Sequence, residues 1–282
     1  MSFAQQDAQE VIDIVRAAAR AEIVTRYRRL GAGAIRTKSS LDDLVTEADL
    51  AAEEAMTKAI TSAFPGCRIV GEEAVAADPS VLDQVASPGV TFIIDPIDGT
   101  SNYANGVNVF GVILSVIENG RSVFGLLYDP LLDDWVMAFR GGGAWFGRPG
   151  EDPVRLVLDQ APGQRVTGYV PLFLFPREIR ADVAAAALEF DRFSTLRCSC
   201  QEYRQLVTGG ADFLMNGMLN VWDHAAGVLA MEEAGGVVQM LDGRPYDPVM
   251  RSGRLLVART PDIFTRAHGA FAPILGDKGS IG

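Results

Sequence analysis

Apolar residues recur along the first third of the chain with spacings that predict two helices and two strands. At the start they repeat every three or four positions, which predicts a helix over residues 4–29. The same spacing predicts a second helix over 46–63, where Thr46 and Asp49 have the spacing of a capping box. Two short apolar runs follow, each typical of a buried strand: residues 68–70 and 90–94.

The pattern changes twice in the rest of the chain. Residues 107–139 alternate apolar runs with turn residues, which predicts an antiparallel meander that ends at Gly141–Gly143. Beyond about residue 152, strands alternate with helices. We therefore predict an N-terminal α+β domain over 1–152 and a C-terminal α/β domain over 153–282. The strands are expected near 165–170, 194–198, 211–215, 237–240 and 255–258, and the helices near 176–190, 201–209, 223–234 and from 261.

Composition narrows the class of protein. The net charge of −11 disfavours nonspecific binding to nucleic acid, which depends on Lys and Arg contacts with phosphates. No apolar run is long enough to span a membrane. The three cysteines form no metal-ligand spacing beyond a weak C-x-C, and the first thirty residues lack the order of an export signal. We therefore expect a cytoplasmic protein, and an anionic substrate would need a bound cation to attract it.

The stretch IIDPIDGTSNYANG places two carboxylates, Asp95 and Asp98, where an apolar strand ends. A turn alone would explain these residue types. The same residues also suit a cation, since the Ile97 carbonyl between the two acids offers another oxygen ligand. Directly afterwards, the amides of Gly99 and Thr100 could bind an anion.

Five acidic residues stand at the ends of predicted elements. Any one of them could simply cap a helix or solvate a loop. Together they indicate a site for hard divalent cations such as Mg²⁺, which take oxygen ligands. An EF-hand is excluded because Ile97 and Gly99 stand where its ligands should be, and a phospho-aspartate phosphatase, whose aspartates are two residues apart, stays open as an alternative. The five are Asp49, Glu72, Asp95, Asp98 and Asp223.

Four motifs occur in a fixed order along the chain: DLVTEAD, GEE, DPIDGTSNYANG and WDHAAG. In this combination the sequence resembles the inositol monophosphatase family of magnesium-dependent, lithium-sensitive phosphatases, over nearly its whole length. The resemblance implies a layered αβαβα sandwich of the inositol monophosphatase and fructose-1,6-bisphosphatase type. It also implies hydrolysis of a small phosphorylated metabolite, and a homodimer, because the family is commonly dimeric.

The resemblance implies roles for individual residues. Glu72, Asp95 and the Ile97 carbonyl would hold one Mg²⁺, and Asp95, Asp98 and Asp223 a second, with two or three ions in all. Asp49 and Thr100 would activate the attacking water, with Glu72 counted among the catalytic residues. The phosphate would contact the amides of Gly99 and Thr100, and Lys38 matches a lysine that precedes DLVTEAD.

The resemblance is weakest on the substrate side. A Gly-Ser-Ala-Ala stretch of the family is replaced by the segment from Cys198 to Arg204, and Asn216 stands where the family has an inositol-contacting glutamate. Cys198, Arg204 and Asn216 are the candidates for substrate contacts on this side. The amide of Asn216 in place of a carboxylate disfavours inositol phosphate as the substrate. Histidinol phosphate, a sugar bisphosphate and a 3′-phosphonucleotide are the alternative substrates. A regulatory interaction protein on the same fold is the alternative from another class.

Overall fold

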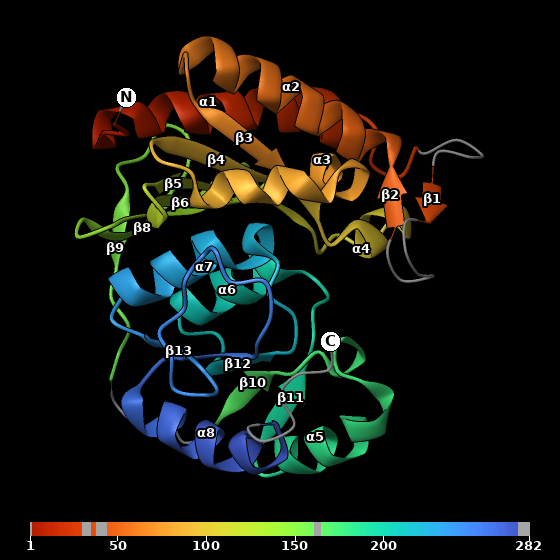
Figure 1. Cartoon of the computed structure of the whole chain (residues 1–282), viewed down its shortest axis with the longest axis vertical. Helices are drawn as coiled ribbons and strands as arrows, with labels where there is room; N and C mark the ends of the chain where they lie inside the picture. The colour runs from red at the N-terminus through yellow and green to blue at the C-terminus, as the bar shows by residue number, and fades with distance from the viewer. Residues whose placement is uncertain (1, 30–34, 38–43, 161–164, 276–282) are drawn as a thin grey trace.

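The computed structural model describes residues 2–29, 35–37, 44–160 and 165–275. Their helices and sheets alternate in layers (Figure 1). Helices α1 and α2 cover the outer face of a large sheet, and α6 and α7 lie between this sheet and a smaller one. Helices α5 and α8 cover the far face of the smaller sheet. This arrangement confirms the predicted αβαβα sandwich.

The outer helices form where the sequence predicted them. Helix α1 (Ala8–Ala18) buries Val11 and Val15 and exposes its acidic positions, and a π-helical segment, η2 (Ala19–Val24), continues it. Helix α2 (Glu47–Ala63) begins at the predicted capping box. The apolar faces of both helices join one buried cluster with the large sheet. A short 3-10 segment precedes them, η1 (Gln5–Asp7).

The large sheet has the strand order β3-β4-β5-β6-β7-β8-β9. Only β3 and β4 run parallel, and each later strand is antiparallel to the one before it. The predicted end of the meander at Gly141–Gly143 is wrong, because Gly141 and Gly142 form a turn and Gly143 begins the first of two more strands. The strands are β3 (Arg68–Gly71), β4 (Val90–Asp98), β5 (Gly111–Glu118), β6 (Arg121–Asp129), β7 (Asp134–Phe139), β8 (Gly143–Gly147) and β9 (Val154–Leu156).

The smaller sheet has the strand order β11-β10-β12-β14-β13 and is mixed. Strand β11 lies two residues earlier than predicted, so residues 195–198 connect it to α6 instead of extending the strand. The strands are β10 (Thr167–Tyr169), β11 (Arg192–Ser194), β12 (Phe213–Asn216), β13 (Val237–Met240) and β14 (Leu255–Ala258). The helices are α5 (Arg180–Ala187), α6 (Ser199–Val207), α7 (Val221–Glu233) and α8 (Pro261–Leu275).

Several short elements were not predicted. They include helix α3 (Glu72–Ala77) and the pair β1 (Ile35–Thr37) and β2 (Leu44–Thr46). Helix α4 (Thr100–Ala104) begins where the amides of Gly99 and Thr100 predict a helix start or an anion-binding nest. Three 3-10 segments are η3 (Pro79–Ala86), η4 (Leu172–Leu174) and η5 (Arg177–Ile179). The domain boundary at residue 152 stays a prediction, although β9 extends the large sheet slightly past it. Within the described ranges, no helix combines the length and apolar character needed to cross a membrane.

Helix α7 is buried between the sheets because small residues let it approach its neighbours. A side-chain carbon on Gly227 would lie 2.2 Å from the Tyr203 ring of α6. We predict that Gly227→Ala lowers the free energy of unfolding by about 1 to 3 kcal/mol, since the ring would have to move in a packed core. Urea unfolding measures this change.

The matched control is Gly269→Ala in α8. Nothing lies within 4 Å of the added carbon there, so the helical propensity of alanine should raise stability by up to about 1 kcal/mol. Equal effects at the two positions would contradict the packing argument.

Candidate active site

The end of strand β4 brings Asp95 and Asp98 to one place. In a regular strand, residues three apart point to opposite faces of the sheet. Here the pairing of β4 with β5 shifts register between Asp95 and Asp98, and this irregularity turns both carboxylates to the same side. The predicted turn at Asp95 is therefore corrected: the strand runs to Asp98 and carries a bulge.

Helix α7 supplies a third carboxylate. Asp223 lies in its first turn, and carboxylate oxygens of Asp95, Asp98 and Asp223 all lie within 4.8 Å of one another. The amide of Asn220 donates a hydrogen bond to Asp223 Oδ2 over 3.1 Å and fixes its orientation. The sequence reasoning did not identify Asn220, which precedes the helix as its N-cap residue.

These carboxyls are buried together, which disfavours their charged forms. Burial raises the pKa of Asp95 well above its usual range, and the nearby acids Glu72, Asp98 and Asp223 raise it further. Burial also raises the pKa of Asp98 to about 6. Asp95 Oδ1 is buried and has no hydrogen-bond partner among the described residues. A divalent cation would offset the charge of the buried carboxylates and would give Asp95 Oδ1 a partner. This set of oxygen donors therefore fits Mg²⁺.

Glu72 lies beside this cluster because of how helix α3 begins. It is the first residue of α3, directly after β3, and its charge contributes to the raised pKa of Asp95 and of Asp223. Glu53 of α2 accepts hydrogen bonds from the Glu73 and Ala74 amides over 2.8 and 2.9 Å, which caps the helix. A side-chain carbon on Gly71 would lie 2.2 Å from the Glu53 carboxyl carbon, so a larger residue there would displace the carboxylate that caps α3. Sequence reasoning missed Glu53 and Gly71, since neither belongs to a motif with visible chemistry.

Asp49 and Thr100 lie close together. Asp49 is fully buried, and its Oδ2 accepts hydrogen bonds from the Thr46 amide and hydroxyl. Its Oδ1 lies 3.2 Å from the Thr100 hydroxyl, which also lies 3.0 Å from the Ile97 carbonyl oxygen. The single hydrogen of Thr100 can serve one of these acceptors at a time. The predicted pair is therefore close together.

The start of helix α6, in the helix layer next to the large sheet, contacts Asp98. The Cys198 thiol donates to Asp98 Oδ2 over 3.1 Å, and the Cys200 amide donates to the same oxygen. Gly99 has a left-handed φ of 87°, and a side-chain carbon there would lie 3.0 Å from the Val109 carbonyl oxygen. The chain can therefore turn from β4 into α4 beneath Cys198 only with glycine at this position.

A cavity of about 140 Å³ opens beside Asp98 and Asp223. Asn216, at the end of β12, lines it, as do Cys198 and the exposed side chain of Arg197. Asn216 Oδ1 accepts a hydrogen bond from the Met218 amide over 2.9 Å. The remaining lining residues are Pro171, Phe173, Leu174, Thr195, Ser199 and Glu202.

The structure gives Arg204 a different role from the predicted substrate contact. Its guanidinium forms a buried ion pair with Asp134 and donates to the Leu127 carbonyl oxygen over 2.9 Å. It extends from α6 to Leu127 of β6 and Asp134 of β7 in the large sheet, and it does not line the cavity. Lys38 lies outside the described residues.

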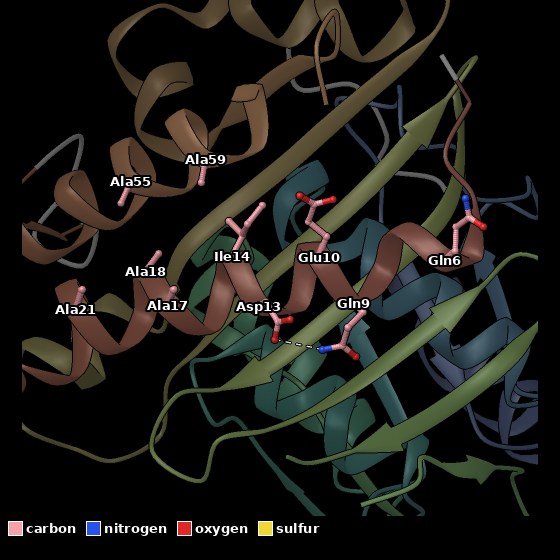
Figure 2. A pocket seen from close by; sticks show the side chains of 10 residues that line it. All are labelled: Gln6, Gln9, Glu10, Asp13, Ile14, Ala17, Ala18, Ala21, Ala55 and Ala59. Carbon is pink, nitrogen blue, oxygen red and sulfur yellow. Dashed lines mark hydrogen bonds between the residues drawn. The ribbon is translucent and has the colours of Figure 1, made fainter. Parts of the chain in front are cut away.

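A larger hollow lies between helices α1 and α2, away from the acidic cluster (Figure 2). Its volume is about 810 Å³, and alanine side chains such as Ala18 and Ala55 form much of its wall. Glu10 and Asp13 also line it, and the side-chain amide of Gln9 donates a hydrogen bond to Asp13 Oδ1 over 3.1 Å. This wall offers few groups for chemistry, whereas the acidic cluster beside the smaller cavity offers several.

Comparison with known proteins finds relatives over most of the chain. Residues 2–274 match the model of the inositol monophosphatase family. The chain is 32% identical over 214 residues to an inositol-1-monophosphatase of Bacillus subtilis, covering 75% of this chain and 78% of that protein. It is 29% identical over 253 residues to the Nus factor SuhB of Pasteurella multocida, covering 86% and 87%.

The fold agrees as well. The structure of the Thermotoga maritima IMPase superposes with a TM-score of 0.77 at 23% sequence identity, covering 96% of this chain and all of that one. At this identity the likeness concerns the fold alone. The match to the family model over nearly the whole chain carries the assignment. The chain therefore belongs to the inositol monophosphatase family of magnesium-dependent phosphoric monoester hydrolases.

Proposed function

We propose that this chain hydrolyses a small phosphomonoester with Mg²⁺ held at the acidic cluster. The observation that carries the proposal is the convergence of carboxylate oxygens of Asp95, Asp98 and Asp223 within 4.8 Å, with one buried oxygen of Asp95 that has no hydrogen-bond partner in the described part of the chain. Glu72 and the Ile97 carbonyl would hold one ion together with Asp95. Asp95 would also hold a second ion, together with Asp98 and Asp223. The proposal allows a third ion.

When bound, the ions supply Lewis-acid activation of a water and stabilise charge on the leaving oxygen. The chain's own residues would handle the proton. The Thr100 hydroxyl oxygen would accept the proton of the attacking water, and the hydroxyl would give its own hydrogen to Asp49 Oδ1, 3.2 Å away. Asp49 suits this role because Thr46 fixes its other oxygen. The backbone amides of Gly99 and Thr100 would hold the phosphate, and Lys38 remains a proposed contact from the family resemblance.

The alcohol portion of the substrate would occupy the cavity beside Asp98. Cys198 and Asn216 line this cavity and are the proposed substrate contacts that remain, since Arg204 is committed to Asp134. This cavity, of about 140 Å³, directly adjoins Asp98 and Asp223. Inositol phosphate, histidinol phosphate, a sugar bisphosphate and a 3′-phosphonucleotide are the substrates to compare.

The test is phosphate release from this panel with and without Mg²⁺. We expect release from at least one member, strictly dependent on Mg²⁺ and lost when a chelator is added. Failure of every substrate at millimolar Mg²⁺, with the protein shown to be folded, would reject the proposal.

A regulatory role on the same fold is the second candidate. It is supported by the likeness to a protein named a Nus factor, at 29% identity. The full set of acidic residues argues for catalysis in addition to any such role. A cell in which Asp95→Asn abolishes turnover but leaves the phenotype of the native gene unchanged would favour the regulatory role.

A cytoplasmic location and a homodimer complete the proposal. The location is supported by the cysteines, all of which are free among the described residues. The homodimer is supported only by the resemblance to a family whose members are commonly dimeric. Light scattering of the purified protein measures its mass directly.

A further inference from the structure

The loop between β12 and α7, residues 217–220, follows Asn216 in the cavity beside Asp98. Asn216 is buried, with only 2% of its surface exposed. The Met218 amide can only donate, so the atom of Asn216 that accepts its hydrogen bond is Oδ1. The Nδ2 group lies on the other branch of the side chain, and no acceptor for it is recorded within the described ranges. The position of Met218 therefore determines which atom of Asn216 is left for a substrate.

Hydrogen bonds hold Met218 from both sides. Its amide donates to Asn216, and its carbonyl oxygen lies 2.9 Å from Nε2 of His224. A carbonyl oxygen can only accept, so Nε2 carries a proton and donates it to this bond. Met218 is 42% exposed, so packing of its side chain contributes little to its position. His224 is therefore an anchor for Met218.

The imidazole of His224 is itself fixed on its other side. The residue is fully buried near the start of α7, and side chains of a helix lean toward its N-terminus, so the ring reaches back to the loop. Its Nδ1 lies 2.9 Å from the Tyr203 hydroxyl of α6 and accepts that hydrogen in the neutral ring. Rotation of the imidazole would break two buried hydrogen bonds, which holds the ring in one orientation.

A buried histidine can also serve only its own hydrogen bonds in a core. His224 differs because the carbonyl it bonds belongs to the residue whose amide orients Asn216. The hydrogen bonds thus run from Tyr203 through His224 and Met218 to the cavity. Without the bond from His224, the Met218 peptide could shift, and the Asn216 amide could turn its oxygen toward the cavity in place of its nitrogen.

We propose that His224 is a positioning residue, which holds Met218 so that Nδ2 of Asn216 donates to an acceptor on the alcohol portion of the substrate. This inference rests on the proposed function and adds how the donor in the cavity is held. His224 does not line the cavity, although it follows Asp223 directly in the sequence. Its effect should therefore appear in substrate binding, as a raised KM at nearly constant kcat.

Glutamine and asparagine at position 224 form a matched pair. The glutamine amide reaches about as far as Nε2, so His224→Gln keeps a donor for the Met218 carbonyl. The asparagine amide reaches only about as far as Nδ1, so His224→Asn keeps a partner for Tyr203 and loses the bond to Met218. The assay uses the full-length protein, Mg²⁺ and the best substrate of the panel. We expect His224→Asn to raise KM about tenfold and His224→Gln to stay within about threefold of the wild type.

Three further variants separate positioning from folding. Tyr203→Phe removes the hydroxyl at Nδ1 but keeps the bond to Met218, so it should unfold at lower urea while KM stays within about twofold. His224→Met fills the space without a donor, so it should raise KM as His224→Asn does, and it serves as the second test if asparagine prevents folding. Asn216→Ala should itself raise KM about tenfold, and adding His224→Asn to it should raise KM no further.

The outcomes separate this inference from the proposed function. A wild type that releases no phosphate from any member of the panel would reject both. An active wild type, with KM unchanged in the folded His224→Asn and His224→Met variants, would overturn the positioning role and leave the phosphatase in place. A further rise of KM when His224→Asn is added to Asn216→Ala would overturn the assignment to Asn216. So would weaker Mg²⁺ binding by His224→Asn, measured by calorimetry, in place of a raised KM.

Discussion

Replacing Asp95 with asparagine should lower kcat/KM for phosphate release by about a thousandfold or more, while the protein remains folded. Asp95 would be a ligand of both proposed ions, and the charges of Glu72, Asp98 and Asp223 are all near enough to raise its pKa. Asparagine has nearly the same shape, so the change removes a charge and little packing. Steady-state kinetics and calorimetric titration with Mg²⁺ measure the two expected losses, in rate and in metal affinity.

Thr100→Ala is the matched comparison for this variant. It removes the hydroxyl 3.2 Å from Asp49 but none of the carboxylates, so it should bind Mg²⁺ normally and still lose rate. The two variants thus separate holding the metal from handling the proton. Turnover equal to that of the wild type in either variant would refute the role given to that residue.

The sequence predicted those elements in which the spacing of apolar residues stayed regular over a whole helix or strand. Helix α2 begins at its capping box, and β4 follows from an unbroken apolar run. The meander was cut short because Gly141–Gly143 was read as an end, although a glycine turn joins antiparallel strands equally well. Strand β11 was misplaced because polar residues at a sheet edge carry no clear period.

The candidate site was predictable to the extent that its chemistry is local in the sequence. Asp95 and Asp98 lie in one short stretch of the sequence, so both could be identified. The shift of register between them depends on the pairing of β4 with β5, and no local pattern reveals it. Glu53 caps α3 across 20 positions, and Cys198 meets Asp98 across 100, so these contacts exist only in the folded chain. The predicted substrate contact of Arg204 is wrong because its ion-pair partner, Asp134, is also remote in the sequence.

The cluster should make the metal-free protein less stable as the pH rises. The pKa of Asp98 is raised from 3.8 to about 6 in the folded state, so the folded protein binds this proton more tightly than the unfolded chain does. Its contribution to stability is full below about pH 4 and is lost as the pH rises through about 6. The loss from Asp98 alone is about 3 kcal/mol, and the raised pKa values of Asp95 and Asp223 add to it in the same direction.

Mg²⁺ should reverse this loss only where the carboxyls are ionised. At pH 8, Mg²⁺ at about a hundred times its dissociation constant should stabilise the fold by about 3 kcal/mol, and near pH 4 it should have almost no effect. Urea unfolding at both pH values, with Mg²⁺ or a chelator, measures this. Other acids titrate in the same range, so the informative quantity is the difference between wild type and Asp98→Asn. That variant should be the more stable protein at pH 8 without metal, and it should lose most of the response to Mg²⁺. A wild type that Mg²⁺ stabilises equally at pH 4 and pH 8 would show that these buried acids are not where the cation binds.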